Sequence, residues 1–390
     1  MKWEKVKLGD ICKYVTSGGT PKSSIKEYYE PKQIPWLKTK EVNYCRIYET
    51  ESYISKDGLD NSSAKMIPQN SVIVAMYGQG DTAGRVAINK IPLTTNQACC
   101  NLIIDETKAY YEFVYYQLVT LYEKMVSLKN GGAQPNLNAA IIKSIEIKLP
   151  PLKTQRYIAD ILSSYDNLIE NNQKQIKLLE EAAQRLYKEW FVDLRFPGYE
   201  NTKTVDGVPE GWKKERLVDI AEIQYGYAFD GTLFNADKNG TPIIRIRNIP
   251  QAETMDYTTE HVSEKYLVQN GEIIVGMDGE FHINAWAGNT AYLVQRTCCI
   301  RPRNRQIKGW LLQAIYEPIK FFEHTVVGAT VSHLGKKHLD SIYLLTSPEE
   351  FYEPFKTFFD KRLLLMNQNR KLREARDRLL PKLMSGKVKV

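Results

Sequence analysis

The residue types that most often carry out catalysis are few in this chain and form no catalytic pattern. Three of the five histidines, His324, His333 and His338, are neighbours in the sequence, but offsets of nine and five residues do not share a helix face. No histidine has the spacing of a metal-ligand set. The sequence therefore predicts no catalytic residue and no metal site.

Glycine-rich sequences that hold phosphates in nucleotide-binding proteins are incomplete here. Gly78 and Gly80 form a G-x-G without a third glycine, and Gly328 and Gly335-Lys336 lack the spacing of a phosphate-binding loop. Enzymes that methylate amino groups of DNA typically have an asparagine or aspartate followed by Pro-Pro and an aromatic residue. No such sequence occurs here. These absences favour a binding protein over an enzyme.

The six cysteines are Cys12, Cys45 and the vicinal pairs Cys99-Cys100 and Cys298-Cys299. No C-x-x-C occurs, which disfavours zinc. We interpret both pairs as small, reduced, buried strand residues.

Composition indicates a soluble globular chain. Its 390 residues, 43% of them hydrophobic, have enough mass for two domains. The net charge of +7 favours a polyanionic partner. No apolar run approaches a membrane span, and the first residues lack a signal-peptide core, so we expect a cytoplasmic protein.

The sequence repeats itself, in order, with offsets that fall from 209 to 197 residues. Four matches carry the repeat: WEKVKLGDI from Trp3 with WKKERLVDI from Trp212, NSVIVAM from Asn70 with NGEIIVGM from Asn270, Cys99-Cys100 with Cys298-Cys299, and Ser144-Ile145 with Ser341-Ile342. Two diverged copies with different loop lengths would produce this pattern.

Each copy is followed by a long run of heptads, which predicts two helices that pack together as a coiled coil. The predicted seam of the first helix is Ile158, Leu162, Tyr165, Ile169, Asn172, Ile176, Leu179 and Leu186. The predicted seam of the second helix is Phe351, Phe358, Leu365, Leu372 and Leu379, with Phe355 and Leu383 on its flank.

These observations predict an α+β fold with a pseudo-twofold internal repeat. Two similar strand-rich α/β domains are separated by two long antiparallel coiled-coil helices. The predicted boundaries are 1–150 for the first domain, 151–195 for the first helix, 196–211 for a turn-rich linker, 212–346 for the second domain and 347–390 for the second helix.

Four sequences resemble the specificity subunit of Type I restriction-modification enzymes. They are LPPLKTQRYI from Leu149, LYKEWFVDLRFPG from Leu186, VPEGW from Val208 and LLPKLMSG from Leu379. The resemblance covers the whole chain, including the repeat. The second helix departs from it, because SPEEF from Ser347 lacks the double proline and the glutamine that begin the first.

The resemblance implies two target recognition domains, each reading one half of a split double-stranded DNA sequence. It implies that the helices set the gap and dock two methylation subunits, which bring S-adenosylmethionine and flip an adenine for N6 methylation. Motor-nuclease subunits would bring ATP and magnesium for ATP-dependent cleavage. We expect no cofactor on this chain, no catalysis by it and no membrane partner.

Loops rich in basic, amide, hydroxyl and aromatic side chains are the predicted DNA contacts, because these groups read base edges and hold phosphates. In the first domain they are Ser17, Gly18, Gly19, Thr20, Lys22, Lys38, Thr39, Lys40, Tyr77, Gln79, Gln134 and Asn136. In the second they are Tyr225, Tyr227, Arg245, Arg247, Asn248, Glu280, Lys336 and Lys337.

Two other classes of function compete with this interpretation. One is a fused methyltransferase or nuclease with degenerate motifs, which methyl transfer by the isolated chain would support. The other is a coiled-coil scaffold that does not read sequence, which equal binding to any DNA would support.

Insertion of four residues after Gln175 tests whether the first helix acts as a ruler. Four residues add about 6 Å to a helix, and one base pair of B-DNA is about 3.4 Å long. We expect the gap between half-sites to grow by one or two base pairs, with both half-sites unchanged, in a map of methylated adenines. A changed half-site with an unchanged gap would refute the hypothesis that the first helix sets the length of the gap.

Overall fold

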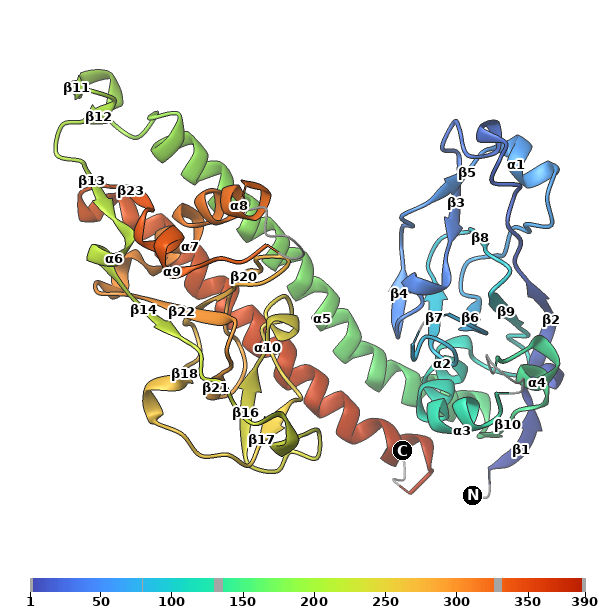
Figure 1. Cartoon of the computed structure of the whole chain (residues 1–390). Coiled ribbons are helices and arrows are strands. Elements are labelled where there is room, and N and C mark those ends of the chain that lie inside the picture. Colours follow the sequence, from blue (N-terminus) through green and yellow to red (C-terminus); the bar gives the residue numbers. More distant parts are fainter. Residues whose placement is uncertain (1–2, 79, 130–135, 326–331, 388–390) are drawn as a thin grey trace. The chain divides into compact units, whose positions relative to one another are not determined.

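The computed structural model describes residues 3–78, 80–129, 136–325 and 332–387 (Figure 1). The chain divides into two compact units, Met1–Asn167 with Arg373–Val390, and Leu168–Leu372. Each unit holds one strand-rich domain and a part of each long helix. Within the described ranges, no helix is both long enough and apolar enough to cross a membrane.

The first domain is built on a five-stranded sheet whose central strands are buried on both faces. Its strand order is β2 (Cys12–Ser17), β9 (Cys99–Ile104), β6 (Val72–Ala75), β7 (Val86–Asn89) and β4 (Cys45–Ile47). Every residue of β6, β7 and β9 is buried, which is why these strands read as continuous apolar runs. Phe113 and Leu118 of helix α2 (Tyr111–Thr120) share a core with this sheet.

Smaller elements complete the first domain. A three-stranded sheet has β3 (Ile34–Leu37) at its centre, paired in parallel with β8 (Thr94–Thr95), and β1 (Glu4–Lys7) pairs with β10 (Glu146–Leu149) in an antiparallel ribbon. These elements and the remaining helices are β1 (Glu4–Lys7), β3 (Ile34–Leu37), β5 (Tyr53–Ile54), α1 (Lys56–Asp60), β8 (Thr94–Thr95), α3 (Tyr122–Ser127), α4 (Ala139–Ser144) and β10 (Glu146–Leu149).

The second domain has the same framework with a four-stranded central sheet. The order is β14 (Ala221–Tyr225), β22 (Thr297–Pro302), β19 (Ile273–Gly276) and β20 (Ile283–Ala285). Around it lie β13 (Lys213–Arg216), α6 (Leu217–Ile220), β15 (Phe234–Asn235), β16 (Thr241–Ile244), β17 (Tyr257–Thr258), β18 (Leu267–Val268), β21 (Ala291–Leu293), α7 (Lys308–Ala314), α8 (Tyr316–Thr325), α9 (Lys336–Asp340) and β23 (Tyr343–Thr346). The short hairpin of β11 (Thr204–Val205) and β12 (Val208–Pro209) precedes this domain.

Equivalent backbone hydrogen bonds confirm the internal repeat. The N–H of Leu8 donates to the carbonyl of Ile145 at 3.0 Å, and that of Leu217 donates to Ile342 at 2.9 Å. The N–H of Leu137 donates to Met76 at 2.9 Å, and that of Leu334 donates to Met277 at 2.8 Å. The two domains are therefore copies at the level of single residues.

The vicinal cysteines do not match as predicted. Cys100 lies opposite Val74 in the β6–β9 pair, and Cys298 lies opposite Val275 in the β19–β22 pair. Cys100 and Cys298 are therefore the equivalent residues, and the match of the two pairs is one residue out of register. Burial raises the pKa of both thiols to about 12, so they stay protonated near neutral pH.

The two long helices are α5 (Leu152–Tyr187), which continues as a π-helical turn over Lys188–Val192, and α10 (Glu353–Met384). The Gln155 side chain fixes the start of α5: it accepts from the N–H of Tyr110 and donates to the carbonyl of Pro150, both at 2.8 Å. Helix α10 starts differently, because there the Tyr352 hydroxyl accepts from the N–H of Ser347 at 2.8 Å.

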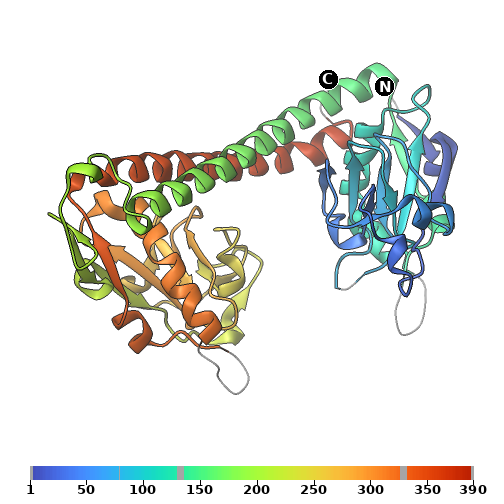
Figure 2. The same ribbon diagram turned by 90° about the horizontal axis from the view of Figure 1, so that it is seen from above.

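Polar contacts show that α5 and α10 are antiparallel in each unit, where they lie side by side in both views (Figure 1, Figure 2). In the second unit Asn172 donates to the Asn369 side chain at 2.9 Å, and Arg362 contacts Glu180 at 2.6 Å. In the first unit Arg376 contacts Asp166 at 2.6 Å. Residue numbers fall along α10 as they rise along α5.

Burial revises the predicted seam. On α5 the buried members are Ile158, Leu162, Ile169 and Asn172, and the half-buried ones are Tyr165, Ile176, Leu179 and Leu186. On α10 Leu365 is buried, and Phe351, Phe358, Leu372 and Leu379 are half-buried. Phe355 and Leu383, predicted on the flank, are buried. They belong to a series of residues spaced seven apart, whose other members, Arg362, Asn369 and Arg376, are polar. A seam predicted from apolar residues alone therefore left this series out.

The ends of the described chain meet within the first unit. A Cβ atom added to Gly386, just beyond α10, would come within 3.0 Å of the Trp3 ring.

Replacing Asn172 tests the buried amide pair. Asn172 and Asn369 are 7% and 3% exposed, so Asn172→Leu leaves the Asn369 carboxamide oxygen without its side-chain donor. We expect the free energy of unfolding to fall by about 1–3 kcal/mol, measured by denaturant unfolding. Asn172→Leu with Asn369→Leu should recover most of this loss. The exposed neighbour supplies the control, Asn171→Leu, which should change little; equal losses in both single variants would contradict the pairing.

Candidate nucleic-acid interface

Two predicted contacts of the first unit lie together at one end of the central sheet. Met76 and then Tyr77 follow the end of β6. The carbonyl of Met76 accepts a hydrogen bond from the N–H of Leu137. This bond brings Asn136 beside the end of β6. Gln79 and Gln134, predicted in the same loops, lie outside the described residues.

The equivalent place in the second unit holds a charged cluster that sequence reasoning did not single out as a site. His333 Nδ1 lies 2.5 Å from Asp278 Oδ1, and Arg296 Nε lies 3.3 Å from Asp278 Oδ2. The repeat places Asp278 where the first unit has Tyr77, and His333 where it has Asn136. A residue-by-residue alignment of the two copies in the sequence would have identified Asp278 and His333.

Glu280, a predicted contact, is on the loop that follows Asp278. Its carboxylate is 3.4 Å from Nδ1 of His282. The glutamate side chain is largely exposed and remains available to a ligand.

The predicted glycine loop of the first unit is packed rather than open. A Cβ at Gly18 would lie 2.1 Å from the Thr95 carbonyl oxygen, and one at Gly19 would lie 2.3 Å from the Ala64 nitrogen. Both glycines are buried, so close packing accounts for glycine at these positions. Ser17 is half-buried, whereas Thr20, which contacts Gln97, and Lys22 are exposed.

The two predicted tyrosines of the second unit lie at the border of its cores. Burial raises the pKa of Tyr225 to about 12, and its hydroxyl is buried without a hydrogen-bond partner among the described residues. Tyr227 packs against Phe229 and Tyr266, with ring centroids 5.0 and 5.2 Å away. Both tyrosines therefore contribute to the packing of the second domain.

Apart from Lys22, the predicted basic residues lie on or next to three short helical turns. Lys38 precedes a 3-10 turn after β3 that contains Thr39 and Lys40, and Arg245 precedes one after β16 that contains Arg247 and Asn248. Lys336 and Lys337 are exposed at the start of α9. The structure thus gathers basic side chains on turns at the ends of strands.

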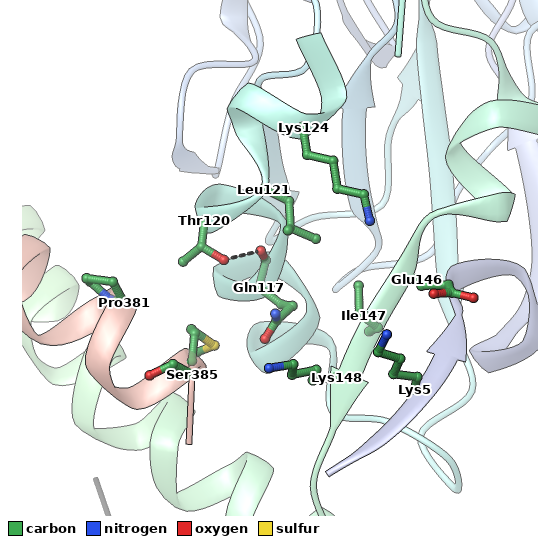
Figure 3. A pocket seen from close by; sticks show the side chains of 11 residues that line it. Lys5, Gln117, Thr120, Leu121, Lys124, Glu146, Ile147, Lys148, Pro381 and Ser385 are labelled. Carbon is green, nitrogen blue, oxygen red and sulfur yellow. Dashed lines mark hydrogen bonds between the residues drawn. The ribbon is translucent and has the colours of Figure 1, made fainter. Parts of the chain in front are cut away.

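A hollow of about 340 Å³ in the first unit lies apart from all of these residues. Lys5, Lys124 and Lys148 surround it, with Gln117 at its wall (Figure 3). No predicted DNA contact lines it. Among the described residues, no three histidine, cysteine, aspartate or glutamate side chains converge as a metal site would require.

Comparisons with known proteins identify the class. A sequence model of the Type I restriction modification DNA specificity domain matches residues 1–181 and 209–350. The chain belongs to this family. Its function is that of a specificity subunit of a Type I restriction-modification system, with DNA target recognition domains.

Individual relatives extend over the whole chain. The Type I restriction enzyme MjaIX specificity subunit of Methanocaldococcus jannaschii is 28% identical, over 100% of this chain and 94% of the relative. The HindI specificity subunit of Haemophilus influenzae is 21% identical over 99% of both chains. The crystal structure of a Type I S subunit from M. genitalium shares the fold, with a TM-score of 0.61, 15% identity and coverage of 98% and 96%.

Alanine at the packed glycines separates packing from DNA contact. Gly226 is the equivalent of Gly18, and a Cβ there would lie 2.0 Å from the Val294 carbonyl oxygen. We expect Gly18→Ala and Gly226→Ala each to lower the free energy of unfolding by about 2 kcal/mol or more. Gly231→Ala is the control, because no atom lies within 4 Å of its added Cβ. Unchanged thermal unfolding of the first two variants would contradict the packing role.

Proposed function

We propose that each unit reads one half of a bipartite DNA target and that the chain itself carries out no catalysis. The observation that carries this proposal is the duplicated framework with different side chains at matched positions. Tyr77 and Asn136 in one copy stand where the other has Asp278 and His333. Aromatic and amide groups make different base contacts from a carboxylate with an imidazole, so the two half-sites should differ in sequence.

The helices would set the gap between the half-sites. Specific contacts a turn or so of B-DNA apart, on one face of the duplex, require a fixed spacing, since the same groove returns about every 34 Å. A helix pair with a polar, register-specific interior supplies a spacer of defined length. The Asn172–Asn369 contact supports that role.

The same helices would dock two methylation subunits. Leu178 and Leu364 are exposed and lie at the same level of the pair, because Glu180 contacts Arg362 two residues away on each helix. Leu168 is exposed on the same α5 segment. Exposed leucines on otherwise polar helices provide apolar surface for a partner.

The cofactors would belong to the partner subunits. S-adenosylmethionine would serve adenine-N6 methylation by the methylation subunits, and ATP with magnesium would serve DNA cleavage by motor-nuclease subunits. The proposed place of action is the cytoplasm, where such a complex would meet DNA.

A domain exchange tests the proposal. Residues 1–150, transplanted onto another family member, should move one half of the methylated target and leave the other half and the gap unchanged. The readout is the map of methylated adenines after co-expression with the methylation subunits.

The reciprocal exchange of residues 212–346 is the control and should move only the opposite half. If either exchange alters both halves, or neither does, the two units do not read independently.

A further inference from the structure

Two basic turns occupy the same position in the two copies of the domain. In the first unit the turn η3 (Thr39–Glu41) follows β3, and in the second η7 (Ile246–Asn248) follows β16. Both strands pair in parallel with the equivalent neighbour, since Leu37 lies opposite Thr95 and Ile244 opposite Leu293. Residues 37–42 read LKTKEV, and residues 244–249 read IRIRNI.

The two turns are held by the same hydrogen bond. The N–H of Lys38 donates to the Glu41 carboxylate at 3.0 Å, and the N–H of Arg245 donates to the Asn248 carboxamide at 2.8 Å. Apolar residues anchor both sides of each turn: Leu37, Val42, Ile244 and Ile249 are all buried. These contacts, which hold each turn, do not involve the cationic side chains.

The first cation of each turn lies near an aromatic ring. Lys38 Nζ is 4.9 Å from the ring centroid of Trp36, and Arg245 Cζ is 5.7 Å from that of Phe234. Such contacts orient a cationic side chain without neutralising it.

The second cation of each turn is the more exposed one. The Lys40 and Arg247 side chains are 63% and 62% exposed. Lys40 pairs with the exposed Glu51, and a pair of this kind contributes little to stability, so an anionic ligand can compete for the cation. Arg247 donates through two nitrogens to Asp256, which is 20% exposed, so an anionic ligand competes there with a stronger pair. Each turn thus offers two cations, one at the residue that precedes the turn and one at its second residue.

We propose that these turns are equivalent phosphate-contact sites, one for each half of the DNA target. This rests on the proposed function. What the two half-sites have in common is the sugar-phosphate backbone, and phosphate contacts position a protein without reading sequence. The turns keep two cations in both units, although Glu41 of the first turn is replaced by the neutral Asn248 in the second. Tyr77 and Asn136, by contrast, are replaced by Asp278 and His333. Shared cations fit the shared backbone, and the differing positions fit the differing bases.

The test compares Lys38→Ala/Lys40→Ala and Arg245→Ala/Arg247→Ala with the unchanged chain, each in complex with the methylation subunits. Binding to a duplex with the mapped target and to a scrambled duplex is measured across a series of salt concentrations. Each lost phosphate contact should make the slope of log K against log salt less negative by about one, or about two for each double variant. The affinity should fall by the same factor on both duplexes, and the methylation map should not change.

Matched controls remove two positive charges from one strand of each domain that lies outside the turns. They are Lys5→Ala/Lys7→Ala in β1 and Lys213→Ala/Lys214→Ala in β13, all exposed positions. Neither should change the salt slope. The double variant Lys38→Arg/Lys40→Arg should keep the original slope. Thermal unfolding checks that each variant is folded, and the milder Lys40→Gln and Arg247→Gln, with about half the slope change, serve if a double variant is not.

Two results would overturn the proposal. An unchanged salt slope in folded double variants means that the turns do not touch phosphate, and an altered half-site in the methylation map means that they read bases. Failure of the proposed function looks different: the unchanged complex would then bind target and scrambled duplexes equally, while the salt slope would still report on the turns.

Discussion

The buried polar contacts between α5 and α10 are the constraint on which the rest of the molecule depends. An apolar seam alone tolerates slippage by a heptad, because one leucine replaces another. The Asn172–Asn369 amide pair does not, since a shift leaves both groups buried without partners. Arg362 with Glu180 and Arg376 with Asp166, each within its own unit, are only partly buried and add a weaker preference for the same register. The proposed spacer needs one length, and this interior favours one register.

Duplication explains how one chain comes to have two related sites. The copies keep the sheet, the turn hydrogen bonds and the packed glycines, all of which are needed to fold. They differ at the strand ends, where Tyr77 and Asp278 occupy equivalent positions. Under the proposed function, stability and recognition depend on different residues, so the residues that contact DNA can change without loss of the fold.

The sequence predicted the elements whose signal is local and periodic. The heptads and the double proline before Leu152 predicted α5, and the apolar runs near Val72 and Ile273 predicted the central strands. Relations that depend on pairing were harder to predict. The cysteine match slipped by one residue, because a shared dipeptide does not reveal which strand face each side chain occupies. The packing of Gly18 against Thr95 could not be predicted, because this close approach is visible only once the strands are paired.

The contact between Trp3 and Gly386 has a consequence for the order of the two halves along the chain. Because both residues lie in the first unit and close to each other, a short peptide could join them and make the polypeptide a closed ring. Reopening that ring at the tight turn between Val205 and Val208 would give a circular permutant that begins with the second half. Apart from the small β11–β12 hairpin, every strand pairing and both helices would survive. The folded structure would therefore accept either order of the two copies along the polypeptide.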